Sequence, residues 1–112
     1  MEEEVTCKPY VTSIKFRESR SEVFYYGLQT FGYIQAERYD QKIAKAIESL
    51  PEHYISYSEC RHLATKSRKY RNIMLDAHLI IYRVTSERIE VLDIVHSKSS
   101  ITKIRNVRKI RL

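Results

Sequence analysis

The residues best suited to chemistry in this sequence are cations and aromatic side chains that alternate between positions 52 and 70. Lys and Arg contact phosphate groups and aromatic rings stack on nucleobases, so this mixture favours nucleic-acid binding. Tyrosines that border a hydrophobic core beside solvated cations would produce the same pattern, and both interpretations stay open. The residues are Tyr54, Tyr57, Arg61, His62, Lys66, Arg68, Lys69 and Tyr70.

Metal and redox chemistry have little support. Cys7 and Cys60 are isolated cysteines, and the spacing of His53, Cys60 and His62 matches no zinc-binding pattern. We therefore expect neither a metal site nor a cofactor. Because the two cysteines form no disulfide framework, a reducing cytoplasm is the expected compartment.

The charge is divided unevenly between the two halves of the chain. Residues 1–60 hold 7 Lys/Arg and 10 Asp/Glu, whereas residues 61–112 hold 13 Lys/Arg and 4 Asp/Glu. A basic half suggests an acidic partner, which is either a nucleic acid or an acidic protein surface. A solvated basic face is the alternative, and it is weaker because the excess lies in one half.

Length and composition predict a single domain over residues 1–112. With only 2 Gly and 2 Pro, the chain has no candidate linker. No apolar run approaches the ~20 residues that a membrane span requires. Residues 1–4 read Met-Glu-Glu-Glu, which is the opposite of the basic start of a signal peptide.

Three short apolar segments near the C-terminal half predict an antiparallel meander. They are residues 72–75, 78–84 and 89–95, rich in β-branched residues and separated by short polar breaks. Residues 78–84 are apolar at nearly every position, so we expect a central strand that is covered on both faces. In the last segment, Glu90 and Asp93 mark positions that we expect to be more exposed to solvent.

A strand and two helices are expected before the meander. Residues 10–16 alternate as a strand does, and Ser19 and Glu22 have the spacing of a capping box that would begin a helix. Gly32 suits the end of that helix, and Pro51 would end the next one. The second helix carries one apolar stripe, made of Ala36, Tyr39, Ile43, Ala46, Ile47 and Leu50.

These elements predict an α+β fold in which a helical hairpin over residues 19–50 packs on a small antiparallel sheet. The hairpin must bury its apolar stripe, and the sheet is the available surface. The expected shared core consists of Ile43, Ile47, Leu50, Ile80, Tyr82 and Val91.

This order of elements resembles the RelE/ParE superfamily of bacterial type II toxins over about residues 8–99. The residues that carry the resemblance are Phe31-Gly32, the segment 35–39, Leu50-Pro51, Tyr70-Arg71, the strand 78–84 and the strand 89–97. Two positions depart from the family pattern. Ala77 stands where a turn glycine is common, and Ser99-Ser100 replaces the usual acidic residue after the last strand.

Similarity to RelE would imply a ribosome-dependent endoribonuclease, an mRNA interferase. Such an enzyme needs a base for the ribose 2′-hydroxyl, cations for the developing phosphorane and an acid for the leaving oxygen. The candidates are Lys66, Arg68, Arg71, Arg83, His96 and Lys98. For His96, a structural role at the sheet edge with a hydrogen bond to the backbone is favoured, and Arg71 and Arg83 can equally be structural.

Similarity to ParE would imply a plasmid-stabilisation toxin that binds DNA gyrase and is not an enzyme. The long hairpin and the strand 78–84 resemble this branch more closely, so it is the preferred interpretation. A family member that has lost toxicity and an unrelated small RNA-binding domain stay open as alternatives.

The resemblance also implies a cognate antitoxin as partner. Two features of the sequence are compatible with that partner. The basic half could attract an acidic disordered tail, and a groove between hairpin and sheet could receive its apolar residues.

Overall fold

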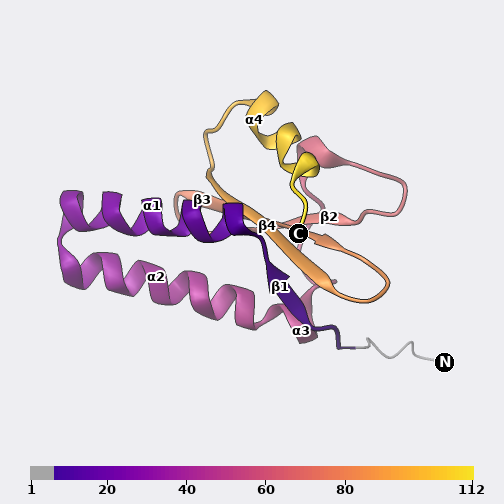
Figure 1. The fold of residues 1–112 in the computed structure, drawn as a ribbon, viewed down its shortest axis with the longest axis horizontal. Helices are drawn as coiled ribbons and strands as arrows, with labels where there is room; N and C mark the ends of the chain where they lie inside the picture. Colours follow the sequence, from indigo (N-terminus) through magenta and orange to yellow (C-terminus); the bar gives the residue numbers. More distant parts are fainter. Residues whose placement is uncertain (1–6) are drawn as a thin grey trace.

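A four-stranded sheet with helices on both faces forms the centre of the molecule (Figure 1). The computed structural model describes residues 7–112, so the prediction about residues 1–4 lies outside the described part. In order across the sheet, the strands are β1 (Tyr10–Thr12), β4 (Ile89–His96), β3 (His78–Val84) and β2 (Tyr70–Met74). The antiparallel meander β2–β3–β4 is confirmed, and β1 joins its edge parallel to β4.

The predicted helical hairpin is confirmed, with one residue as its joint. Helices α1 (Ile14–Phe31) and α2 (Tyr33–Glu48) meet at Gly32, whose φ of 89° lies in a region that only glycine adopts easily. The remaining helical elements are α3 (Leu50–His53), the 3-10 helix η1 (Arg61–Leu63), α4 (Ile101–Asn106) and the 3-10 helix η2 (Val107–Lys109). Among the described residues, none of these helices combines the length and apolar character needed to cross a membrane.

The start of the first helix differs from the prediction. The strand ends at Thr12, and the helix begins at Ile14, so the capping role assigned to Ser19 is wrong. Ser13 is the N-cap instead: its Oγ accepts a hydrogen bond from the Phe16 amide at 2.8 Å and donates one to the Leu92 carbonyl at 2.5 Å. This buried hydroxyl ties the helix start to β4.

The second helix also ends differently. It stops at Glu48, and Pro51 lies in the first turn of α3, where its missing N–H costs nothing.

Two hydrophobic cores lie on opposite faces of the sheet. All six predicted core residues belong to the core between hairpin and sheet, together with Phe16 from α1. The other face packs against α4 and η1 through Leu63, Ile81, Leu92, Ile104 and Val107, among others. The α4 side of this second core was not predicted, although Ile101, Ile104 and Val107 recur at helical spacing after the N-cap Ser100.

The prediction that Glu90 and Asp93 mark open positions is wrong. Their exposed fractions are 7% and 4%, because β4 is an inner strand that is covered on both faces. A β-bulge opposite Ile81 and Tyr82 leaves Leu92 without a direct partner on β3. Both carboxylates are satisfied inside the protein, Glu90 by arginines and Asp93 by hydrogen bonds from Ser19 and the Ile94 amide.

Candidate functional site

The six candidate residues for phosphate chemistry do not converge. The register pairs Tyr70 with Arg83 and Arg71 with Tyr82, so the two arginines point to opposite faces of the sheet. His96 pairs with His78, five residues from Arg83 along β3, which corresponds to ~17 Å of strand. A single phosphate therefore cannot contact both arginines and His96 in this arrangement.

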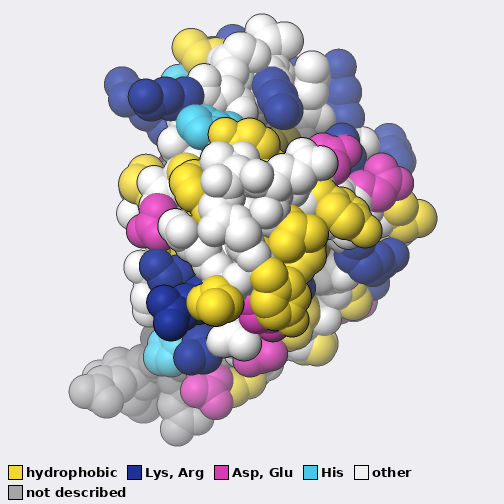
Figure 2. Space-filling model, turned by 90° about the vertical axis from the view of Figure 1, so that its left-hand side faces the viewer, with side chains coloured by type: hydrophobic (Ala, Val, Ile, Leu, Met, Phe, Trp, Pro, Cys, Tyr) yellow, Lys and Arg dark blue, Asp and Glu magenta, His cyan; other side chains and the backbone are white. Residues whose placement is uncertain are grey.

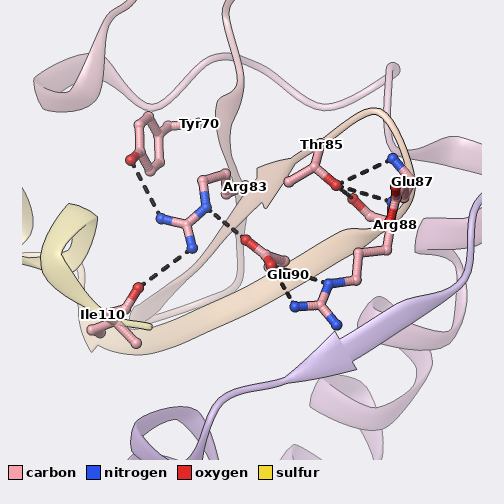
Figure 3. A network of polar contacts seen from close by, with 7 residues as sticks. All are labelled: Tyr70, Arg83, Thr85, Glu87, Arg88, Glu90 and Ile110. Carbon is pink, nitrogen blue, oxygen red and sulfur yellow. Dashed lines mark hydrogen bonds and ion pairs between the residues drawn. The ribbon is translucent and has the colours of Figure 1, made fainter. Parts of the chain in front are cut away.

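Arg83 belongs to a partly buried polar network that links strands β3 and β4 to the C-terminal segment (Figure 3). Its Nε donates to Glu90 Oε1 at 2.7 Å, and Arg88 donates to the other carboxylate oxygen at 2.9 Å. Arg83 also donates to the Ile110 carbonyl at 3.4 Å. Burial opposes ionisation of Glu90, but the hydrogen bonds from Arg83 and Arg88 outweigh it and lower its pKa. These contacts give Arg83 a structural role.

Arg71 and the tyrosines of segment 52–70 are also structural. Arg71 donates to the carbonyls of Ile55 and Tyr57, at 3.2 and 2.7 Å, and so anchors the connection that leads into β2. Tyr54 and Tyr70 are buried, which confirms for them the interpretation as residues that border the core. They offer no free ring for a nucleobase.

The remaining candidates are exposed. Lys66 and Arg68 lie in the loop between η1 and β2, and Lys98 lies in the turn after β4. His96 Nδ1 accepts a hydrogen bond from the Lys98 amide at 3.0 Å, which is the backbone contact expected of a histidine at the sheet edge.

A cavity of about 620 Å³ lies between the hairpin and the ends of β3 and β4. Aliphatic and aromatic side chains from both helices and from β4 form most of its wall, and polar side chains complete it. The apolar part includes Val23, Phe24, Gly27, Ala36, Ile43 and Ile94, and the polar part includes Tyr39, His78, Asp93, His96 and Lys103. Such a mixture suits apolar side chains of a partner with a few fixed polar contacts.

Three polar residues of the wall, Tyr39, His78 and His96, form a row of rings that we call the polar edge of the cavity. The Tyr39 hydroxyl and His78 Nδ1 share a hydrogen bond of 2.7 Å, and the centroids of the His78 and His96 rings are 5.5 Å apart. Burial lowers the pKa of His78, and the charge of His96 lowers it further. His78 is therefore held neutral at pH 7, and it links α2 to the sheet.

We expect this neutral histidine to make stability depend on pH. The unfolded chain restores an ordinary His78 pKa near 6.5, so below about pH 6.5 the unfolded state binds more protons than the folded state. The contribution of neutral His78 to the free energy of unfolding should be complete above about pH 6.5. It should be lost as the pH falls toward the lower pKa that His78 has in the folded state. Urea unfolding at about pH 7.5 and about pH 5.5 measures the loss.

His78→Gln is expected to reduce this loss, because glutamine does not titrate. His53→Gln is the matched control, since His53 is exposed on α3. An equal loss of stability on acidification in the wild type and in His78→Gln would contradict the assignment.

Large apolar side chains are exposed around the hairpin tip. Five of them have exposed fractions between 58% and 68%: Tyr25, Tyr26, Phe31, Tyr33 and Ile34. Figure 2 views the molecule from this end and shows hydrophobic side chains gathered there. Exposed clusters of this kind mark protein-binding surfaces. The cavity lies where the sequence analysis expects a groove between hairpin and sheet. The exposed hairpin tip was not predicted, although the aromatic residues flanking Gly32 were an available signal.

Comparisons with known proteins identify one family by sequence and one similar fold by structure. A family model described as the ParE toxin of type II toxin-antitoxin system, parDE, matches residues 11–101. The solved structure of a chromosomal ParDE TA system from P. aeruginosa is similar in fold, with a TM-score of 0.67 and 14% sequence identity. The match covers 82% of this chain and 98% of that chain. No curated protein sequence matches the chain.

Proposed function

The chain belongs to the ParE toxin family of type II toxin–antitoxin systems, and we propose that this ParE-like toxin acts by binding and inhibiting DNA gyrase. Membership of a ParDE-type system implies a cognate antitoxin as partner. The proposal assigns the toxic activity to a binding surface, with gyrase as the target that the ParE branch implies.

The observation that carries the proposal is the exposed hairpin tip. Its large side chains are mostly aromatic, and aromatic residues dominate the energetic centres of protein interfaces. The hairpin extends beyond the sheet, so the tip can enter a partner without a steric clash with the rest of the chain (Figure 1). A surface of this kind supports a protein target.

The runner-up, RelE-like mRNA cleavage, has weaker support. General acid–base catalysis requires a proton donor and a proton acceptor within hydrogen-bond reach of one phosphate. Arg71 and Arg83 lie on opposite faces, and both are held by structural contacts. The separation of the candidate cations therefore weakens the case for ribosome-dependent cleavage and leaves gyrase binding as the better-supported proposal.

The proposal is tested by gyrase supercoiling of a relaxed plasmid with the purified toxin. We expect supercoiling to stop at toxin concentrations on the order of micromolar, which is typical of a specific protein interface. Antitoxin added in equal amount should restore it. Unchanged supercoiling at all toxin concentrations would refute the proposal.

The cavity between hairpin and sheet is the proposed seat for apolar residues of the antitoxin. Its polar edge, with Tyr39 and His78, would fix the orientation of the bound segment. The basic C-terminal half of the toxin would attract an acidic antitoxin tail before these contacts form.

We therefore expect the association rate of toxin and antitoxin to fall as salt increases, because screening weakens attraction beyond a Debye length of ~10 Å at 0.1 M. Stopped-flow mixing at several ionic strengths measures this rate. The dissociation rate, which reports the close contacts, should change much less. An association rate independent of ionic strength would count against electrostatic attraction.

A further inference from the structure

Two segments far apart in the sequence form one strongly basic surface. Residues 60–69 and 97–112 together contain ten Lys/Arg and no Asp/Glu, whereas the remainder of the chain contains ten Lys/Arg and 14 Asp/Glu. We call the two segments the basic lobe. Its cations are Arg61, Lys66, Arg68, Lys69, Lys98, Lys103, Arg105, Arg108, Lys109 and Arg111.

The basic lobe is a packed part of the fold. Cys60 and Leu63 from the first segment share a hydrophobic core with Ile104 and Val107 from the second. The C-terminal end is held by the hydrogen bond from Arg83 to the Ile110 carbonyl. Ten positive charges are thus kept together although they repel one another, and folding alone does not require this arrangement.

The lobe's cations are available to a partner. All ten are exposed, and within residues 7–112 none forms an ion pair with a carboxylate. The ion pairs of the described residues lie elsewhere, as Arg20 with Asp40 and Lys42 with Asp76 illustrate. Figure 2 shows Lys and Arg side chains at the top of the molecule, where Figure 1 places α4.

We propose that the basic lobe binds the sugar–phosphate backbone of duplex DNA. Its exposed uncharged polar side chains are hydroxyls and an amide, which are the groups that accompany Lys and Arg at DNA backbones. They include Thr65, Ser67, Ser97, Ser100, Thr102 and Asn106. Neither segment contains Phe, Tyr or Trp, and the His62 ring is half-buried, so the lobe offers little ring surface for stacking single-stranded bases.

An acidic polypeptide can be attracted by these charges during association, but it fits this surface less well as the bound partner. A disordered segment that folds on binding needs apolar surface to offset the entropy that it loses. The large exposed hydrophobic residues of the lobe are Ile101 and Leu112, whereas the cavity and the hairpin tip offer far more apolar surface. The inference goes beyond gyrase inhibition and does not depend on it, because the isolated toxin should bind DNA without gyrase.

The test is fluorescence anisotropy of the purified toxin with a labelled DNA duplex of about 20 base pairs. We expect binding at low salt, with the logarithm of the association constant falling by about 0.9 per phosphate contact for each unit of log salt. Single-stranded DNA of equal length should bind more weakly, and an RNA duplex serves to compare the two kinds of backbone.

Two triple variants probe the two segments of the lobe. Lys66→Gln, Arg68→Gln and Lys69→Gln form the loop variant, and Arg105→Gln, Arg108→Gln and Lys109→Gln form the tail variant. The matched control removes three exposed cations outside the lobe, by Lys15→Gln, Arg38→Gln and Lys45→Gln. Each lobe variant should weaken duplex binding about tenfold or more and reduce the salt slope by ~2 to 3, whereas the control should change it far less.

Several results would overturn the inference. One is that the toxin does not bind the duplex at low salt, and another is that the control variant loses as much affinity as the lobe variants. A third is that single-stranded DNA or duplex RNA binds more tightly than duplex DNA. The last is that the lobe variants bind the antitoxin more weakly but bind DNA as the wild type does. Circular dichroism melts verify that each variant folds. If one lobe variant does not fold, the other still tests DNA binding. A failure of the toxin to inhibit gyrase in the supercoiling assay would not change the DNA-binding result.

Discussion

Replacing Ile47 by aspartate is expected to unfold the protein. Ile47 is 5% exposed and lies in the core between hairpin and sheet, which also contains Ile43, Leu50 and Tyr82. Burying an unpaired carboxylate there costs several kcal/mol, on the order of the whole stability of a small domain, which is roughly 5–15 kcal/mol.

The same chemical change at Ile34 is the matched control. Ile34 lies on the same helix but is 68% exposed, so Ile34→Asp should change the melting temperature only slightly. Circular dichroism melts of the two variants and the wild type measure the difference. A melt of Ile47→Asp equal to that of Ile34→Asp would contradict the placement of the hairpin on the sheet.

Removing three side chains of the hairpin tip is expected to weaken gyrase inhibition ~10²-fold or more. The substitutions are Tyr26→Ser, Phe31→Ser and Ile34→Ser, and buried aromatic or aliphatic anchors often contribute about 2 kcal/mol each to an interface. All three side chains are more than half exposed in the isolated toxin, so the fold should be retained. The concentration that halves gyrase supercoiling measures the effect.

A second triple variant controls for the loss of apolar surface as such. Ile55, Met74 and Leu112 are large, exposed hydrophobic residues away from the tip, and their replacement by serine should leave inhibition nearly unchanged. Equal weakening by both variants would show that the tip has no special role. Full inhibition by the tip variant would show that gyrase, if bound, is bound elsewhere.

Periodicity made most of the fold predictable. The apolar stripe of α2 and the β-branched runs of β3 and β4 depend on local side-chain spacing, and they appear where the sequence places them. The start of α1 was not predictable in this way. Residues 10–16 alternate like a strand, but a helix begins directly after Ser13. The Ser13 hydroxyl is held there by the Leu92 carbonyl, which lies 79 residues away in the sequence.

The burial of Glu90 and Asp93 was not predictable for a similar reason. Glu90 is buried because Arg83 and Arg88 neutralise it, and neither partnership can be read from spacing alone. The same contacts hold the Arg83 guanidinium within the protein. The candidate residues were recognised by type, but only the strand register reveals that Arg71 and Arg83 face opposite sides.

We expect this ParE-like toxin to act on gyrase and not on translating ribosomes. The most direct measurement compares the wild type and His96→Gln in two assays, gyrase supercoiling and mRNA cleavage on ribosomes. We predict that both proteins inhibit supercoiling equally and that neither cuts mRNA. Codon-phased cuts by the wild type that fall ~10²-fold or more in His96→Gln, with supercoiling unaffected, would contradict the claim and identify a nuclease that uses His96.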